Sequence, residues 1–285
     1  MIARSYLYVP GNAPDKLAKV LSRGADAVIV DLEDAVPWPA KAAARDGVAS
    51  WLRSLDGDTA GVEVWVRVNP GALGVTDVDA VVAPGITGVM VAKTESRAEI
   101  EAIDAALGKA EAREGLDAGS VGVVPLLESA ASLLDARAIA GAPRVVRLQV
   151  GEADLAADLG FGDGTDDADW APIRTQVVLV SAAAGISAPV APVSTDFRDL
   201  DRFAAGTRAL ARRGYVGRAC IHPAQVAVAN EVFTPSAETL AQARALVAVF
   251  DEAVAAGSGV IIGPDGRMVD EAVVRRARSV IALAR

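Results

Sequence analysis

The sequence is poorest in cysteine and histidine, with one residue of each among 285. The single thiol, Cys220, cannot form an intramolecular disulfide or a zinc site of several thiolates, and this usage is typical of a reducing cytoplasm. Because His222 is the only histidine, the chain cannot form a metal centre with several histidine ligands. Any metal bound here is therefore expected to be a hard cation held by carboxylate oxygens.

Positive charge and long apolar runs are scarce as well. Lysine and arginine number 28 against 37 aspartates and glutamates, which gives a net charge of −9. Nucleic acid and anionic membranes both reward a basic face, so neither is expected as a partner. No uncharged run approaches the roughly 20 residues that span a bilayer, and the first residues contain no apolar stretch of signal-peptide length. We expect a soluble cytoplasmic protein that binds small molecules.

Apolar residues are plentiful, at 52% of the chain with a mean hydropathy of +0.32. Runs rich in valine and isoleucine alternate with longer segments of helical spacing, which predicts parallel strands buried on both faces. A parallel α/β barrel commonly uses about 250 residues for one domain. The predicted fold is therefore a (β/α)8 TIM barrel over residues 1–233.

Residues 234–285 are predicted to form a C-terminal extension. Pro235-Ser236 opens a helical stretch, a turn is expected at Pro264-Asp265-Gly266, and a final amphipathic helix carries Val273 and Ile281. Because this tail lies beyond the expected end of a barrel, we expect it to pack on a neighbouring subunit.

Five apolar runs in the first 154 residues break off at charged side chains. They end at Asp31, at Arg67, at Lys93, at Glu128, and at the segment Gly151-Glu-Ala-Asp154. In a parallel barrel the carboxyl ends of the strands share one mouth, so charges spread along the sequence would meet in space. The pattern predicts an enzyme whose active site is built from strand ends.

Glu128 and Asp154 are the strongest pair among these residues, because they follow successive predicted strands. Two carboxylates without a nearby histidine or thiolate suit Mg²⁺, which takes one or two carboxylates and completes its octahedron with water and substrate. The alternative is that each carboxylate only caps the helix that follows it.

Arg67 and Lys93 are the candidate cations of the mouth. The planar guanidinium of Arg67 can bind a substrate carboxylate through two parallel hydrogen bonds; alternatively it forms a buried ion pair with Asp31, Glu33 or Asp34. Lys93 has three interpretations: a Schiff base with a carbonyl substrate, a source of positive charge, or an ion pair with the acidic cluster.

The acidic cluster Asp31-Leu32-Glu33-Asp34 places three acids at one strand end, and such crowding requires a compensating cation. Asp34 is predicted to be catalytic if the cluster orients metal-bound waters; the alternative is that the acids only neutralise Arg67 and Lys93. His222 is a possible general base, or a hydrogen-bonded structural residue, and no serine triad can be built around it.

Ordered motifs along nearly the whole chain carry a family resemblance. They are Arg4-Ser-Tyr-Leu-Tyr-Val-Pro-Gly-Asn12, Asp31-Leu-Glu-Asp-Ala-Val36, Arg67-Val-Asn69, Leu126-Leu-Glu128, Gly151-Glu-Ala-Asp154, Gly217-Arg-Ala-Cys-Ile-His-Pro223 and Met268-Val-Asp270. In this order they resemble the citrate lyase beta subunit-like group of the HpcH/HpaI aldolase family.

The resemblance implies a Mg²⁺-dependent β/α barrel, with Mn²⁺ as a possible substitute, that cleaves or forms a carbon–carbon bond in acyl-CoA thioesters. Relatives of this kind act on citramalyl-CoA, malyl-CoA or 3-hydroxy-3-methylglutaryl-CoA, release acetyl-CoA and a keto acid, and form trimers or hexamers. Three alternatives stay open: a citryl-carrier-protein lyase subunit of a citrate lyase complex, a metal-free class I aldolase using Lys93, and a non-catalytic thioester-binding protein.

Carried onto matching positions, the resemblance implies that Glu128 and Asp154 bind the metal and that Arg67 binds the carboxylate of the keto-acid fragment. Asp270, supplied by the adjacent subunit's tail, would be the catalytic acid/base. The phosphates of coenzyme A need cations, and Arg4 and Lys16, near the first strand and helix, are the candidates.

Overall fold

The computed structural model describes residues 2–162, 164–263 and 266–284, and these fall into two compact units. The larger unit runs from Ala3 to Asn230, and the smaller contains Ile2 and the stretch that begins at Glu231. Each unit is described by itself below. No helix in the described ranges is long and apolar enough to cross a membrane.

The larger unit alternates strands and helices from its first residues. Its elements are β1 (Ser5–Pro10), α1 (Pro14–Val20), β2 (Ala27–Asp31), the 3₁₀ helix Trp38–Ala40, α2 (Lys41–Leu55), β3 (Glu63–Val68), α3 (Gly71–Val81), β4 (Gly88–Val91), α4 (Arg97–Glu114), β5 (Gly122–Leu127), α5 (Ala130–Leu134), α6 (Ala136–Ala140), β6 (Gln149–Val150), α7 (Glu152–Leu159), α8 (Asp167–Ala184), α9 (Leu200–Arg213), β7 (Arg218–Cys220) and α10 (Pro223–Val232). The α/β class predicted from the sequence is confirmed.

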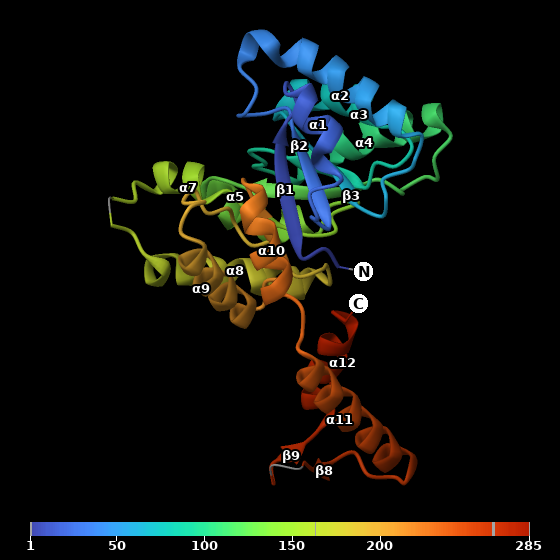
Figure 1. The fold of residues 1–285 in the computed structure, drawn as a ribbon, viewed down its shortest axis with the longest axis vertical. Coiled ribbons are helices and arrows are strands. Elements are labelled where there is room, and N and C mark those ends of the chain that lie inside the picture. The colour runs from blue at the N-terminus through green and yellow to red at the C-terminus, as the bar shows by residue number, and fades with distance from the viewer. Residues whose placement is uncertain (1, 163, 264–265, 285) are drawn as a thin grey trace. The chain divides into compact units, whose positions relative to one another are not determined.

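The strands form one parallel sheet in the order β6-β5-β4-β3-β2-β1-β7. A short segment bridges its two ends, because Val190 pairs with Gln149 of β6 and Ala191 pairs with Arg218 of β7. The sheet therefore curls into a TIM-barrel-like ring, with helices outside it (Figure 1). All carboxyl ends of the parallel strands face the same side of this ring.

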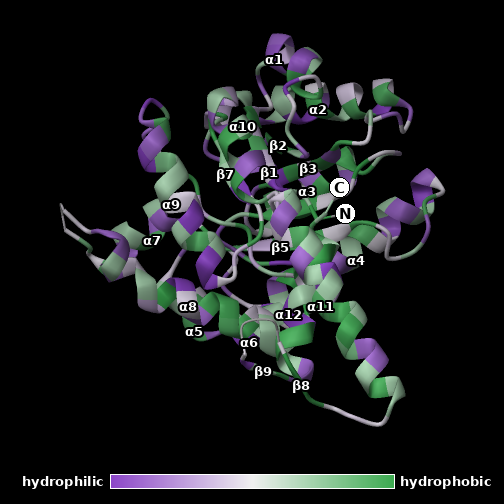
Figure 2. Cartoon of the chain, turned by 60° about the horizontal axis from the view of Figure 1, so that its bottom comes forward, coloured by the Kyte–Doolittle hydropathy of each residue, from purple (hydrophilic) through white to green (hydrophobic). Residues whose placement is uncertain are grey.

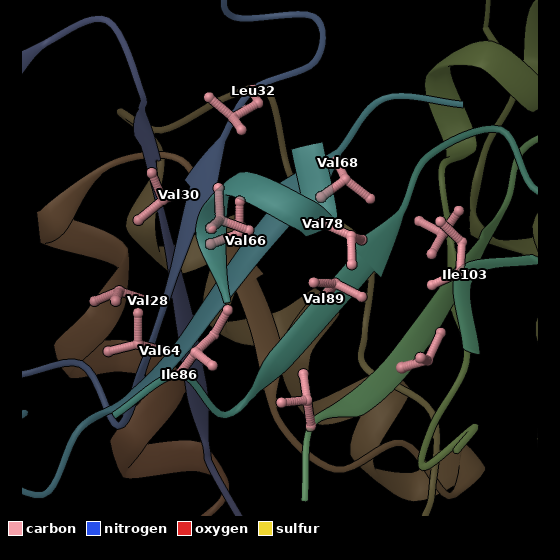
Figure 3. Close-up of a cluster of buried hydrophobic side chains, with 14 of the residues drawn as sticks. Val28, Val30, Leu32, Val64, Val66, Val68, Val78, Ile86, Val89 and Ile103 are labelled. Carbon is pink, nitrogen blue, oxygen red and sulfur yellow. The ribbon is translucent and has the colours of Figure 1, made fainter. Parts of the chain in front are cut away.

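Strand residues are buried on both faces, as the valine-rich runs predict. Even-numbered valines of β2 and β3 point outward from the ring and belong to one buried cluster, which also contains Val78 of α3 and Ile103 of α4 (Figure 3). Odd-numbered residues of the same strands, such as Ile29 and Trp65, point into the ring and form a second cluster. Outside the ring, the helices mix hydrophilic and hydrophobic residues along their length, as expected for elements with one buried face (Figure 2).

The smaller unit contains α11 (Ala237–Ala255), a hairpin of β8 (Ile261–Ile262) and β9 (Met268–Val269), and α12 (Glu271–Ala282). Phe250, Val269 and Val274 form its core. Ser236 caps α11 by accepting a hydrogen bond from the Thr239 N–H, so the helix start predicted at Pro235-Ser236 is confirmed. The predicted turn at Pro264-Asp265-Gly266 falls partly outside the described residues.

Candidate active site

The alternation of strand residues explains why charged side chains point into the mouth of the ring. On β2 the inward positions Ala27 and Ile29 are followed by Asp31, and on β3 the inward Trp65 is followed by Arg67. Asp31 and Arg67 are direct partners in the register of these two strands. The period of two that buries the valines outside the ring therefore brings this carboxylate and this guanidinium together inside it.

A cavity of about 880 Å³ opens at this end of the larger unit. Its lining combines strand ends with the beginning of α1, the start of α7 and the β7–α10 turn. The charged and polar side chains that line it are Tyr8, Asp15, Lys16, Lys19, Arg23, Asp31, Asp34, Arg67, Glu128, Gln149, Glu152, Asp154 and His222. The prediction that charges at successive strand ends converge on one mouth is confirmed for Asp31, Arg67, Glu128 and Asp154.

Arg67 is held by two carboxylates at the cavity wall. Its Nε donates to Asp31 Oδ1 at 2.7 Å and its Nη2 to Oδ2 at 2.6 Å, while Nη1 lies 3.2 Å from Glu33 Oε2. Its guanidinium carbon also lies 5.2 Å from the centre of the Tyr8 ring. The ion pair that the sequence left as an alternative is therefore present, and Arg67 faces the cavity as well.

Lys93 is fixed in the acidic cluster. It adopts a left-handed backbone conformation, with φ of 50°, two residues after the end of β4. Its Nζ pairs with Glu33 and lies 3.2 Å from Asp34 Oδ1. Burial lowers the pKa of Lys93, but the bond to Glu33 and the charges of both acids outweigh burial and raise it overall. Of the three interpretations of Lys93, the ion pair with the acidic cluster describes the observed contacts. Asp34 lines the cavity and its side chain is about half exposed.

Glu128 follows β5 and is almost fully buried, at 6% exposure. Its Oε2 accepts a hydrogen bond from the Lys93 backbone N–H at 2.6 Å. The carboxylate rests against Gly151, where an added Cβ would lie 2.6 Å from Glu128 Cγ. Burial raises the pKa of Glu128 to about 7; the Lys93 N–H and the charge of Arg67 oppose this, and Asp154 and Glu33 add to it.

Asp154 lies in the first turn of α7 and lines the same cavity. In the described parts of the chain, neither Asp154 nor Glu128 forms an ion pair with a lysine or arginine. The helix-capping alternative does not describe Glu128, because Ser129 caps α5. Asp154 makes no side-chain cap to α7, but its place in the first turn is one where an acid interacts favourably with the positive end of the helix. Two carboxylates are left without a cation inside one cavity.

This pair fits the donor set of a hard divalent cation. The described residues contain no group of three or more His, Cys, Asp or Glu side chains arranged to hold a metal. Mg²⁺ does not require such a group, because it usually keeps several waters and takes one or two carboxylates. The raised pKa of Glu128 reports a desolvated carboxylate beside another acid, and a bound cation would relieve that condition.

The two predicted coenzyme A contacts lie in different places. Lys16 lines the cavity, together with Lys19 and Arg23, which the sequence reasoning did not select. The spacing of these three residues along α1 and the turn after it was the available signal, since residues three or four apart share a helix face. Arg4 instead donates to Asp26 at 2.7 Å at the amino end of β1, and it is not among the residues that line the cavity.

Two further candidates have defined local roles. His222 lines the cavity, its Nδ1 accepts the Ala224 N–H at 3.1 Å, and its ring stacks on Phe197 with centres 5.0 Å apart, so the structural interpretation describes its contacts. Asp270 belongs to the smaller unit, where it caps α12 by accepting the Ala272 and Val273 N–H groups.

The chain is similar to known proteins along nearly its whole length. The family model for HpcH/HpaI aldolase/citrate lyase matches residues 4–223. A citrate lyase subunit beta-like protein of Deinococcus radiodurans is 35% identical over 284 residues, which cover 99% of this chain and 97% of the relative. An L-malyl-CoA/beta-methylmalyl-CoA lyase of Rhodobacter capsulatus is 31% identical over 302 residues, covering 99% and 94%.

Among solved structures, protein CitE of Mycobacterium tuberculosis in complex with magnesium, acetoacetate and coenzyme A superposes with a TM-score of 0.75. It is 28% identical, and the match covers 98% of this chain and 97% of that one. The resemblance inferred from the ordered motifs is confirmed: the chain belongs to the HpcH/HpaI aldolase/citrate lyase family.

Proposed function

We propose that this protein is a Mg²⁺-dependent carbon–carbon lyase that reversibly cleaves a 3-hydroxyacyl-CoA, such as citramalyl-CoA, malyl-CoA or 3-hydroxy-3-methylglutaryl-CoA, into acetyl-CoA and a keto acid. The observation that carries this proposal is the cavity in which the unpaired Glu128 and Asp154 meet the fixed guanidinium of Arg67. Relatives named as malyl-CoA lyases and a neighbour bound to magnesium, acetoacetate and coenzyme A support it.

Glu128 and Asp154 are the residues that would hold the cation, with Mn²⁺ as a possible substitute for Mg²⁺. When bound, the cation supplies Lewis acidity, which lowers the pKa of a hydroxyl and polarises a keto group. Glu128 has one oxygen engaged by the Lys93 N–H, and this bond fixes the orientation of its carboxylate. Asp34 stays a proposed catalytic residue that orients water beside this pair.

Arg67 would bind the carboxylate of the keto-acid fragment. A guanidinium has five N–H groups, so donors remain for a ligand after its bonds to Asp31 and Glu33 are made. Asp31 is itself held by the N–H groups of Glu33 and Ala35, at 2.9 and 3.0 Å. The guanidinium is therefore oriented before substrate arrives, which reduces the entropy cost of positioning the reacting groups.

In the cleavage direction, a general base in the cavity would accept the 3-hydroxyl proton as the C2–C3 bond breaks. The electron pair of that bond passes to the thioester fragment as an enolate, and the hydroxyl carbon becomes the keto carbon. Asp270 would then protonate the enolate carbon to give acetyl-CoA, and it would remove the same proton in the condensation direction.

The basic residues at α1 suit the phosphates of coenzyme A. Lys16, Lys19 and Arg23 line one part of the cavity, away from the strand that carries Glu128. Lys16 is retained from the sequence prediction. Arg4 is not carried into the proposal, because its guanidinium is paired with Asp26 at the opposite end of β1.

We further propose that residues 1–233 form a (β/α)8 barrel and that residues 234–285 pack on a neighbouring subunit of a cytoplasmic homotrimer or hexamer, with Asp270 entering the neighbour's site. Mixing inactive Asp270→Ala and Glu128→Ala variants should then restore part of the activity. No restoration after subunit exchange would contradict a shared site.

Two alternatives are separated by simple tests. A class I aldolase needs a neutral lysine, whereas the acids around Lys93 raise its pKa, so borohydride with a keto acid should trap no adduct. A citrate lyase subunit would cleave a citryl thioester on a carrier protein and be inactive with free CoA esters.

The decisive assay is condensation in the presence of Mg²⁺. Acetyl-CoA and propionyl-CoA are each paired with glyoxylate, pyruvate, oxaloacetate and acetoacetate, and products are identified by mass. We expect at least one product, lost on adding EDTA and recovered on restoring Mg²⁺. A chain that binds coenzyme A but forms no product in any pairing would instead be a thioester-binding protein.

A further inference from the structure

Gln149 is a buried polar side chain whose hydrogen bonding is incomplete. It lies on β6 between Leu148 and Val150, both of which pack outward, so its side chain points into the ring. It is 3% exposed, it lines the cavity, and its Oε1 has no hydrogen-bond partner among the described residues. Folding normally pairs such an atom, because a buried carbonyl that loses water without gaining a donor costs free energy.

Gln225 shows how the same side chain is normally treated in this fold. Its Oε1 accepts the N–H groups of Ile221 and His222, at 2.9 and 3.2 Å, and its Nε2 donates to the Ser194 carbonyl at 3.1 Å. Gln225 is as deeply buried as Gln149, but it is saturated. The unpaired amide at position 149 is therefore specific to the place where the ring meets the cavity.

The position of Gln149 relates it to the candidate cation site. In the sheet Gln149 pairs with Leu126, which lies two residues before Glu128, and Gln149 itself lies two residues before Gly151. A rise of about 3.3 Å per residue places the backbone of Gln149 roughly 7 Å below that of Glu128 along the strand direction. Among the inward side chains that line the cavity, Leu126 and Val193 are apolar, and Tyr8, which carries a hydroxyl, forms no hydrogen bond with Gln149 Oε1.

We infer that Gln149 is a specificity residue: its amide binds a polar substituent on the keto-acid fragment and selects 2-oxo acids that carry a hydrogen-bonding group beyond the keto carbon. The inference rests on the proposed lyase function and narrows its substrates, because pyruvate and glyoxylate, which citramalyl-CoA and malyl-CoA release, carry no such group and would be disfavoured. A ligand anchored by Arg67 and Glu128 at the mouth would extend its side chain down toward this amide. Heavy-atom positions do not distinguish the two ends of an amide, but either orientation presents an unpaired group.

A site that keeps an unpaired amide for a ligand rejects an analogue without the matching group, because the amide then stays unsatisfied in the complex. The test uses two 2-oxo acids of nearly equal size, 3-hydroxypyruvate and 2-oxobutyrate, which differ by a hydroxyl in place of a methyl group. We expect the wild-type protein to prefer hydroxypyruvate by about tenfold or more in kcat/KM for condensation with acetyl-CoA.

The variant Gln149→Met keeps the length and shape of the side chain and removes the amide. We expect it to lose this preference, mainly through KM for hydroxypyruvate, while condensation with 2-oxobutyrate is unchanged or faster. Its melting temperature should equal or exceed that of the wild type, because no intramolecular hydrogen bond is lost. The matched control is Gln176→Met on α8, whose Nε2 donates to the Leu133 carbonyl outside the cavity; it should leave the preference intact.

A preference that survives in Gln149→Met would overturn the inference, as would a wild-type protein that turns over both acids equally. If the wild type condenses no oxo acid at all, the lyase proposal fails instead. Binding of the two oxo acids to the wild type and to Gln149→Met is then compared instead, from the increase in melting temperature that each acid produces in the presence of Mg²⁺. Equal shifts in wild type and Gln149→Met would overturn the assignment of Gln149 independently of turnover.

Discussion

The two sides of the cavity mouth differ in whether their charged side chains form ion pairs within the protein. On the side built by β2, β3 and β4, Arg67 and Lys93 are each paired with carboxylates of the acidic cluster. On the side built by β5 and β6, Glu128 and Asp154 face the cavity without a cation. The charges of the first side are balanced within the protein; those of the second side are not, and we propose that a bound cation balances them.

The largest effect should come from removing the unpaired charge. Glu128→Gln should reduce Mg²⁺-dependent turnover by at least about 100-fold, because one of the two proposed carboxylate ligands to the cation loses its charge. The melting temperature should stay the same or rise, since the raised pKa of Glu128 marks a carboxylate that folding disfavours in its charged form. Turnover and circular dichroism melts measure the two effects on the same sample.

Glu111→Gln is the matched control, because Glu111 is a buried carboxylate that is fully paired. It binds Arg144 at 2.9 Å through Nη2 and accepts the N–H groups of Gly119 and Val121, which lower its pKa against the opposing effect of burial. Breaking such a pair should cost about 3 kcal/mol of unfolding free energy and leave turnover intact. A Glu111→Gln variant as stable as the wild type, or a Glu128→Gln variant less stable than it, would contradict the distinction between paired and unpaired buried carboxylates.

Gly151→Ala tests whether the position of the Glu128 carboxylate, on the side built by β5 and β6, is required for turnover. An added Cβ would press on Glu128, whose Cγ lies 2.6 Å from that position, so the carboxylate must move away from the cation site. We expect a loss of turnover of about tenfold to 100-fold with retained fold. Gly47→Ala, in a helix where the added Cβ meets nothing within 4 Å, should cost no activity. Full activity in Gly151→Ala would mean that the Glu128 position is not required.

Arg67→Lys tests the role of the oriented guanidinium on the side built by β2, β3 and β4. A lysine cannot reproduce the two bonds to Asp31, so the positive charge is kept while its orientation is lost. KM for the keto acid in the condensation direction should rise about tenfold or more, with little change in KM for acetyl-CoA. Equal increases in both constants would contradict the assignment of Arg67 to the keto-acid fragment.

The smallest effect concerns the sheet beneath the cavity. Burial raises the pKa of the Cys220 thiol to about 12, with a smaller opposing effect of Arg218, so the group stays a neutral thiol at physiological pH. We expect no labelling by iodoacetamide at pH 8 in the native protein and complete labelling in guanidinium chloride. Rapid labelling of the native protein would show that β7 separates from the sheet in solution. That result would contradict a sheet rigid enough to position the side chains of the cavity.

Sequence reasoning recovered the features that depend on local periodicity. The inward positions of Asp31 and Arg67 follow from strand alternation, and the placement of Glu128 and Asp154 in one cavity follows from successive strand ends. Arg4 shows where this reasoning fails: proximity to the first strand does not reveal which end of the strand a residue occupies, and Asp26 holds it at the far end.

The unpaired amide of Gln149 could not be read from sequence for a different reason. Whether a buried polar atom has a partner depends on every neighbour in three dimensions, and Gln149 and Gln225 are the same residue type in equally buried positions. Lys19 was accessible in principle, because its spacing from Lys16 places both on one side of α1, and Arg23 follows at the next such interval in the turn after that helix.

The central claim is that Glu128 and Asp154 share one divalent cation. Titrating Mn²⁺ into the metal-free full-length protein, with free Mn²⁺ followed by electron paramagnetic resonance, tests it without relying on turnover. We expect one site per chain in the wild type, displaced by Mg²⁺, and loss of that site in both Glu128→Gln and Asp154→Asn but not in Glu111→Gln. Unchanged Mn²⁺ binding in either of the first two variants would contradict the claim.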